Sequence, residues 1–166
     1  MLYLFIGVPG AGKTTTAEII AAQTGAVHLC ADAERHKLFE NPTHSIEESE
    51  TLYKKLNKQT DQLLSEGKSV VFDTNFNFYA DRQKMREIAK HYVADIKIIW
   101  LTTPLELSKN RSIGVHYTRN GYANRMTNEQ FTQIVSKLEP PIESENAIHI
   151  DGTEIHKEEV LQKLGL

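Results

Sequence analysis

The fold is decided by one stretch of sequence, LYLFIGVPGAGKTTT at residues 2–16. An apolar run leads into three glycines and a proline, and these are followed by a lysine and three threonines. Residues 7–14 match the phosphate-loop pattern G-x-x-x-x-G-K-[ST]. Glycines let successive backbone N–H groups turn inward around a phosphate, and the N-terminal end of the next helix adds positive charge. The stretch therefore predicts nucleotide binding between a strand and a helix.

Two side chains of this loop have expected roles. Lys13 would bridge the terminal phosphates of ATP or GTP, and the hydroxyl of Thr14 would coordinate Mg²⁺. The alternative is a glycine-rich turn that carries a lysine by chance. The position of the pattern, between an apolar run and a helical pattern, favours a phosphate loop.

Apolar runs alternate with helical patterns along the rest of the chain. The expected strands are LYLFIGV, AVHL, SVVF, ADIKIIWL and NAIHI. Helices are expected over residues 13–24, 45–67, 79–91, 127–138 and 153–164, the second and fourth opened by capping-box spacings. This alternation predicts an α/β fold of the P-loop NTPase class, with a parallel five-stranded sheet sandwiched by helices.

Size and composition favour one ordinary folded domain over residues 1–166. The chain is 40% hydrophobic and 25% charged, and its net charge of -3 disfavours a surface built for extensive phosphate-backbone binding. Cys30 is the only cysteine, so we expect no disulfide within the chain and no cysteine-based zinc site. No apolar run approaches the roughly 20 residues of a membrane span, and no targeting segment is visible. We therefore expect a cytoplasmic protein without a membrane partner.

Polar residues follow the predicted strands, where open parallel sheets place their ligands. Asp32 and Asp73 are expected on the two strands nearest the phosphate loop. Asp32 is the candidate general base, and Asp73 would hold the magnesium shell or bind the acceptor. Each of these residues could instead cap a helix or form a turn, as could Asp151 and the Thr102–Thr103 pair. His28, on an apolar strand, is interpreted as a packed core residue.

Residues 110–125, NRSIGVHYTRNGYANR, fit neither a helix nor a strand pattern. Such long connections are usually functional. Three guanidiniums, those of Arg111, Arg119 and Arg125, suit the charge spread over phosphate oxygens. Together with two glycines they predict an arginine-bearing lid, the alternative being a solvated basic loop.

Taken together, these motifs resemble P-loop kinases of the polynucleotide 5′-hydroxyl kinase type, a group that includes zeta-toxin-like and other small predicted kinases. Segments 7–15, 30–39, 70–82 and 150–153 are similar to its phosphate loop, its D-x-x-R element, its acceptor-site element and its adenine loop. The resemblance implies nucleotide contacts from Gly7, Pro9, Gly10, Ala11, Gly12, Lys13, Thr14, Thr15, Asp151, Gly152 and Thr153. It implies acceptor contacts from Asp32, Arg35, Asp73, Thr74, Asn75 and Arg82. Metal ligation would fall to Thr14 and Asp73, and catalysis to Lys13, Asp32, Arg35, Arg111, Arg119 and Arg125.

The predicted function is ATP-dependent transfer of the γ-phosphate to a hydroxyl acceptor. The first candidate acceptor is the 5′-hydroxyl end of a nucleic acid, because Arg35 and Arg82 are expected to flank it and grip the first internucleotide phosphate. A kinase for a small metabolite, nucleoside or antibiotic is the alternative, which the negative net charge favours. A non-catalytic nucleotide-dependent switch is the third hypothesis, but a switch would need neither Asp32 nor Arg35.

Overall fold

A parallel sheet forms the centre of the protein. The computed structural model describes residues 1–117 and 123–166. Within these residues five parallel strands pair in the order β2-β3-β1-β4-β7. The strands are β1 (Leu2–Ile6), β2 (Val27–Cys30), β3 (Val70–Asp73), β4 (Ile96–Leu101) and β7 (Ile148–Ile150). The predicted α/β fold with a five-stranded parallel sheet is confirmed.

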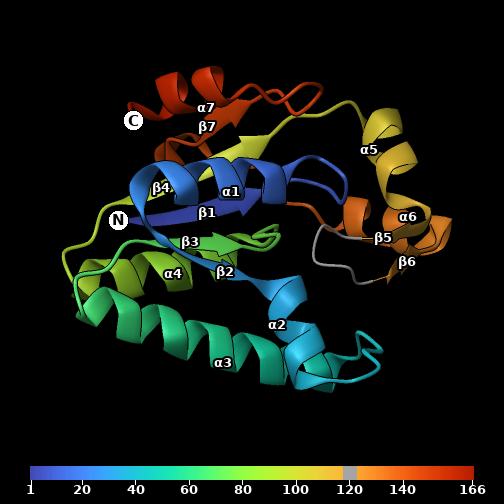
Figure 1. Ribbon diagram of the computed structural model, residues 1–166, viewed down its shortest axis with the longest axis horizontal. Coiled ribbons are helices and arrows are strands. Elements are labelled where there is room, and N and C mark those ends of the chain that lie inside the picture. Colours follow the sequence, from blue (N-terminus) through green and yellow to red (C-terminus); the bar gives the residue numbers. More distant parts are fainter. Residues whose placement is uncertain (118–122) are drawn as a thin grey trace.

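Helices cover both faces of the sheet, with α1 and α7 on one face and α3 and α4 on the other (Figure 1). The helices are α1 (Lys13–Thr24), α2 (Ala31–Leu38), α3 (Ile46–Ser65), α4 (Tyr79–His91), α5 (Leu105–Ser112), α6 (Asn128–Ser136), α7 (Lys157–Leu164) and the short 3₁₀ helix η1 (Glu143–Glu145). Not one of the helices within the described ranges has the length and apolar character that a membrane crossing requires.

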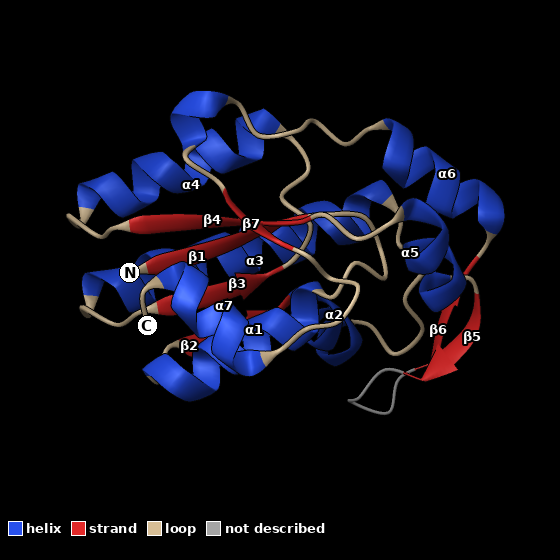
Figure 2. Cartoon of the chain, turned by 90° about the horizontal axis from the view of Figure 1, so that it is seen from above, coloured by secondary structure: helices blue, strands red, loops and turns tan. Residues whose placement is uncertain are grey.

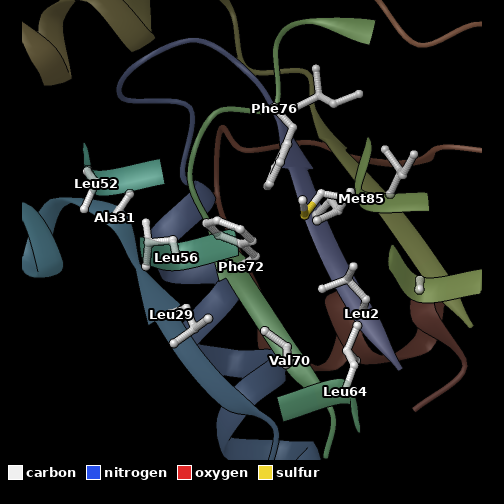
Figure 3. Close-up of a cluster of buried hydrophobic side chains, with 14 residues drawn as sticks. Leu2, Leu29, Ala31, Leu52, Leu56, Leu64, Val70, Phe72, Phe76 and Met85 are labelled. Atoms are coloured by element: carbon white, nitrogen blue, oxygen red, sulfur yellow. The ribbon is translucent and has the colours of Figure 1, made fainter. Parts of the chain in front are cut away.

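The core is divided into two layers by the sheet. Successive side chains of a strand point to opposite faces, and β1 is completely buried. Leu2 and Leu4 pack in the layer under α3 and α4. Figure 3 shows Leu2 in this layer together with Phe72 and Met85. Tyr3 packs in the opposite layer, under α1 and α7. Each large apolar side chain buried in this way contributes about 1.5–3 kcal/mol, which holds β1 and the loop after it at the centre.

Several of the predicted helix boundaries agree with the structure. Helices α1 and α4 occupy their predicted residues, and the predicted capping box of Thr127 and Gln130 opens α6. Helix α7 begins at Lys157 and not at residue 153, because residues 151–156 form a loop. At the start of α3, Ser45 accepts a hydrogen bond from the Glu48 N–H, but the Glu48 carboxylate bonds residues 43 and 44 and not Ser45.

The order of the strands corrects one expectation. Strand β3 lies directly beside β1. Strand β2 does not pair with β1, because β3 lies between them. Asp73 therefore ends a strand adjacent to the phosphate loop, whereas Asp32 follows a strand further out and reaches the loop from the first turn of α2. Chain order alone does not determine which strand pairs with β1, because the helical crossovers can span one strand or two.

The segment 110–125 is more regular than expected. Helix α5 extends to Ser112, and the strands β5 (Gly114–Tyr117) and β6 (Ala123–Met126) form an antiparallel hairpin. Figure 2 shows α5, α6 and this hairpin gathered at the end of the sheet where α2 also lies. The strand signal was missed because these four-residue strands mix polar and apolar residues without a clean alternation. Arg119 lies outside the described residues, and Arg125 is described through its backbone only.

Candidate active site

The loop between β1 and α1 depends on its glycines. Gly10 and Gly12 adopt the left-handed conformation, with φ of 75° and 101°. A Cβ at Gly10 would also collide with the Ser108 carbonyl, and one at Gly12 with the side chain of Ile155. The sequence therefore places glycine where the backbone must turn and where neighbouring elements press against it. This arrangement is the phosphate-loop geometry that residues 7–14 predicted.

Lys13 is held at the mouth of this loop. Its Nζ donates hydrogen bonds of 2.9 Å to the carbonyls of Gly7 and Val8. Burial lowers the pKa of the Lys13 ammonium to about 8, although the nearby carboxylates of Asp73 and Asp32 act in the opposite direction. The lysine is thus a desolvated cation next to the loop, where phosphate oxygens could replace its backbone partners.

Neighbouring elements support the loop from behind. The Asn77 side-chain carbonyl accepts a 3.2 Å hydrogen bond from the Gly7 N–H, and the Thr103 hydroxyl donates a 2.7 Å hydrogen bond to the Ala11 carbonyl. Asn77 comes from the segment after β3, and Thr103 from the segment after β4. The two strands that flank β1 therefore both brace the loop.

The loop after β7 packs against the phosphate loop. A Cβ at Gly152 would collide with the Ala11 carbonyl, so only glycine permits this approach. Arg111 donates 2.7 Å hydrogen bonds to the carbonyls of Gly152 and Thr153, which ties α5 to the same loop. The Asp151 carboxylate accepts a hydrogen bond from the Thr153 N–H, and hydrogen bonding with the Thr153 side chain, followed by this N–H, lowers the pKa of Asp151. Asp151 thus forms the turn that presents Gly152 and Thr153.

These elements surround a cleft of about 1250 Å³. The structure brings most of the residues predicted from sequence to its walls: Pro9, Gly10, Gly12, Lys13, Thr14, Thr15, Asp32, Arg35, Asp73, Thr74, Asn75, Arg111, Gly152 and Thr153. Gly7, Ala11 and Asp151 lie just behind the walls, in the hydrogen bonds described above. The cleft has a loop side, formed by the phosphate loop with Arg111 and residues 152–153, and an acceptor side, formed by α2, the start of α3 and the end of β3.

Two carboxylates lie on the acceptor side, and their environments differ. Asp32 is exposed to the cleft from the first turn of α2. Asp73 is only 4% exposed, and its Oδ2 lies 3.1 Å from Nε2 of His28. His28 is therefore an ion-pairing or hydrogen-bonding partner of Asp73, which corrects its interpretation as a simple core residue. Burial and Asp73 together raise the pKa of the Cys30 thiol to about 12, so this cysteine is not a nucleophile.

Arg35 lies at the floor of the acceptor side. The residue is 6% exposed, its Nη2 donates a 3.2 Å hydrogen bond to the Ser49 hydroxyl, and its Nη1 lies 3.6 Å from a Glu48 carboxylate oxygen. Nη1 has no hydrogen-bond partner of its own. A buried guanidinium N–H without a hydrogen bond is costly, so Arg35 Nη1 is a candidate hydrogen-bond donor at this wall.

Tyr53 and Thr74 complete this wall with a hydroxyl pair. Their oxygens lie 2.9 Å apart, and burial raises the pKa of the Tyr53 phenol. Tyr53 and Ser49 were not predicted as site residues, although both lie on α3 one turn apart. No local motif marks them, because they reach the cleft only when α3 packs beside α2.

Arg82 is not part of the cleft, which corrects its predicted role at the acceptor. Its side chain is completely buried and forms a bidentate ion pair with Glu145. Arg82 Nε donates to Oε1 at 2.8 Å, and Nη2 donates to Oε2 at 2.9 Å. Its remaining Nη1 donates to the carbonyls of Phe76 and Glu139. Arg82 therefore has a structural role, joining α4 to η1 and to the segment after β3.

A phosphate loop that connects a central parallel strand to a helix, with polar residues at the carboxyl ends of the flanking strands, defines a P-loop nucleotide-binding fold. The chain belongs to a family of AAA domains, whose family model matches residues 2–141. A comparison with curated protein sequences found no match.

Solved structures of kinases share this fold. A candidate kinase from Chloroflexus aurantiacus has a TM-score of 0.74 at 17% identity, and the match covers 99% of this chain and 96% of the other. A gluconokinase from Sinorhizobium meliloti has a TM-score of 0.67 at 20% identity, covering 97% and 87%. The APS kinase CysC of Mycobacterium tuberculosis, in complex with AMPPNP and APS, has a TM-score of 0.68 at 19% identity, covering 99% and 97%. These likenesses establish the fold and do not single out the polynucleotide 5′-hydroxyl kinase type.

Proposed function

We propose that the protein is an ATP-dependent kinase whose acceptor is a hydroxyl group of a small polar molecule. The observation that carries this proposal is the charge of the acceptor side. Asp32, Glu40 and Asp73 contribute carboxylates there and His36 and His44 contribute imidazoles, whereas Arg35 is the one guanidinium among the described residues of that side. Glu48 already lies 3.6 Å from this guanidinium.

This excess of carboxylates over guanidiniums disfavours a nucleic acid, with its chain of phosphates, as the acceptor. A nucleic acid end needs several cationic or N–H partners along its backbone, and carboxylates repel it. The grip on the first internucleotide phosphate was expected from Arg35 and Arg82 together, but Arg82 is buried against Glu145. A small molecule with hydroxyl groups, and at most one anionic group at Arg35 Nη1, suits the carboxylate, amide and hydroxyl side chains of this wall.

The loop side would hold the nucleotide. Backbone N–H groups of residues 10–14 and the Lys13 ammonium would bind the phosphates, and residues 152–153 would line the entrance to the nucleoside position. The Thr14 hydroxyl and the Asp73 carboxylate both face the cleft and supply the oxygen ligands that Mg²⁺ prefers, Asp73 directly or through water. When bound, Mg²⁺ would offset the negative charge of the phosphates.

Asp32 would act as the general base. The acceptor oxygen attacks the γ-phosphorus, the bond from that phosphorus to the β–γ bridging oxygen breaks, and ADP leaves. The proton of the acceptor hydroxyl passes to the Asp32 carboxylate. Lys13 stays beside the phosphates throughout, and Arg111 keeps residues 152–153 against the loop.

A transfer assay with γ-labelled ATP tests the proposal. The protein is incubated with a panel of sugars, sugar acids, nucleosides and other hydroxylated metabolites, and in parallel with 5′-hydroxyl oligonucleotides, with Lys13→Ala as the background control. We expect label in at least one small molecule and none in the oligonucleotides. Efficient labelling of oligonucleotide ends, absent in Lys13→Ala, would restore the nucleic-acid hypothesis and overturn the small-molecule acceptor.

A further inference from the structure

Three different metal-ligand side chains meet on two neighbouring strands. His28 and Cys30 are two residues apart on β2, so they point to the same face, and Cys30 is paired in register with Asp73 of β3. The ring nitrogen, the sulfur and a carboxylate oxygen of these residues all lie within 4.8 Å of one another. The shortest of these separations, between His28 Nε2 and Asp73 Oδ2, is 3.1 Å.

This donor set suits a different cation from Mg²⁺. Imidazole, thiolate and carboxylate are the three ligand types of protein zinc sites, whereas Mg²⁺ prefers oxygen ligands. Bond lengths of 2.0–2.3 Å in a tetrahedral site place neighbouring ligand atoms roughly 3.5 Å apart. Small side-chain rotations would bring the three atoms to that spacing.

The site is open on one side. Cys30 and Asp73 line the nucleotide cleft, so an ion has an entry path and a fourth position for water or a ligand oxygen. Asp73 is also a candidate ligand of Mg²⁺ there. A zinc ion held by Asp73 would therefore remove this carboxylate from the magnesium shell.

We propose that His28, Cys30 and Asp73 form a Zn²⁺ site at the base of the cleft, and that its occupancy blocks phosphoryl transfer. Burial and the Asp73 carboxylate raise the pKa of the Cys30 thiol in the metal-free protein, but the charge of a bound cation favours the thiolate, so on binding the thiol releases its proton to water. The expectation from sequence that a single cysteine excludes a cysteine-containing zinc site is thereby revised, since a histidine and an aspartate complete the set. Metal binding at this site does not depend on the proposed function, whereas the block of transfer does.

Cobalt is the spectroscopic probe for the site. The full metal-free chain is titrated with Co²⁺, which shows a thiolate-to-cobalt charge-transfer band when sulfur is a ligand, and Zn²⁺ affinity is measured by competition with a chromophoric chelator. We expect one equivalent of metal with this band. Cys30→Ser should abolish the band, and both Cys30→Ser and His28→Gln should weaken Zn²⁺ binding more than about tenfold, since even outer-shell partners are worth that much. His149→Gln, an exposed histidine of β7 at the opposite edge of the sheet, is the matched control and should leave both readouts unchanged.

The outcomes separate the two proposals. Absence of the band in wild type, or a band that persists in Cys30→Ser, would overturn the zinc site whether or not the protein is an active kinase. Once an acceptor is known, Zn²⁺ should inhibit transfer by wild type and inhibit Cys30→Ser at least tenfold less, each compared with its own rate without Zn²⁺. Equal inhibition of both would overturn the block of transfer through this site. A protein with the cobalt band but without transfer to any acceptor would refute the proposed function and leave the metal site standing.

Discussion

The two sides of the cleft are built in different ways. The loop side is formed mainly by backbone groups, and glycines at positions 10, 12 and 152 permit their geometry. On the acceptor side, side chains from α2, α3 and β3 form the wall, and Arg35 and Tyr53 reach it from two successive helices. We therefore expect the loop side to bind phosphates of any nucleotide, and the acceptor side to determine the specificity of the proposed kinase.

The largest expected effect lies on the acceptor side, at the proposed base. Asp32→Asn should lower phosphoryl transfer by about 10²–10⁴-fold, the usual contribution of a general base, and leave ATP affinity within a few-fold. Transfer to the acceptor and binding of a fluorescent ATP analogue are measured in parallel. Glu34→Gln is the matched control on the same helix, because Glu34 pairs with Lys37 and Lys55 and does not line the cleft. A variant that lost nucleotide binding but kept its turnover at saturating ATP would show that Asp32 belongs to the loop side.

Substitution of Arg82 tests whether this residue is structural or belongs to the acceptor side. Arg82→Met should lower the free energy of unfolding by about 3–5 kcal/mol, because it leaves the buried Glu145 carboxylate without its partner. Chemical denaturation measures this loss. The double variant Arg82→Met with Glu145→Leu should recover much of the stability, since two apolar side chains can replace a buried pair.

The acceptor KM of folded Arg82→Met distinguishes the structural role from the role predicted from sequence. We expect this KM to stay near the wild-type value, whereas Arg35→Met should raise it. A stable Arg82→Met protein with a strongly raised KM would place Arg82 at the acceptor after all.

Lys13 tests the loop side. Lys13→Ala should reduce the transfer rate by about 10²–10³-fold, by analogy with the removal of other preorganised charge stabilisers, while the fold stays intact. Circular dichroism establishes that the variant is folded, and the transfer assay measures its rate. Undiminished transfer by a folded Lys13→Ala protein would contradict the phosphate-loop assignment.

Features that depend on local sequence were predictable, and those that depend on packing were not. The strand-to-helix position of the glycine loop, the limits of α1 and the capping box of α6 arise from neighbouring residues, and each was found where the sequence placed it. The insertion of β3 between β1 and β2 has no local signal. Arg82 lies 63 residues before Glu145, so a motif centred on β3 could not reveal this partner.

The residues of the candidate site also separate into those that local motifs predict and those that depend on packing. Fourteen residues predicted from motifs line the cleft, but Ser49 and Tyr53 were missed because α3 carries only an amphipathic pattern. The pairing of His28 with Asp73 depends on the register of β2 and β3. The sequence shows two separate strands and contains no information on that register until both are seen in one sheet.

The smallest expected effect concerns the pH dependence of nucleotide binding on the loop side. The pKa of Lys13 is lowered to about 8 by burial, so in the free protein its charge is present below pH 8 and is lost as the pH rises through this value. Bound phosphates favour the ammonium and raise its pKa, so binding takes up a proton at alkaline pH. By linkage, affinity for the nucleotide should fall about tenfold between pH 7 and pH 9.

Lys13→Arg keeps its charge over this range and should show a flat profile, because the guanidinium pKa exceeds about 12. Equilibrium titration of both proteins with an ATP analogue at fixed Mg²⁺ measures the difference. Equal slopes for the two proteins would mean that the titration of Lys13 does not set the pH dependence of nucleotide binding.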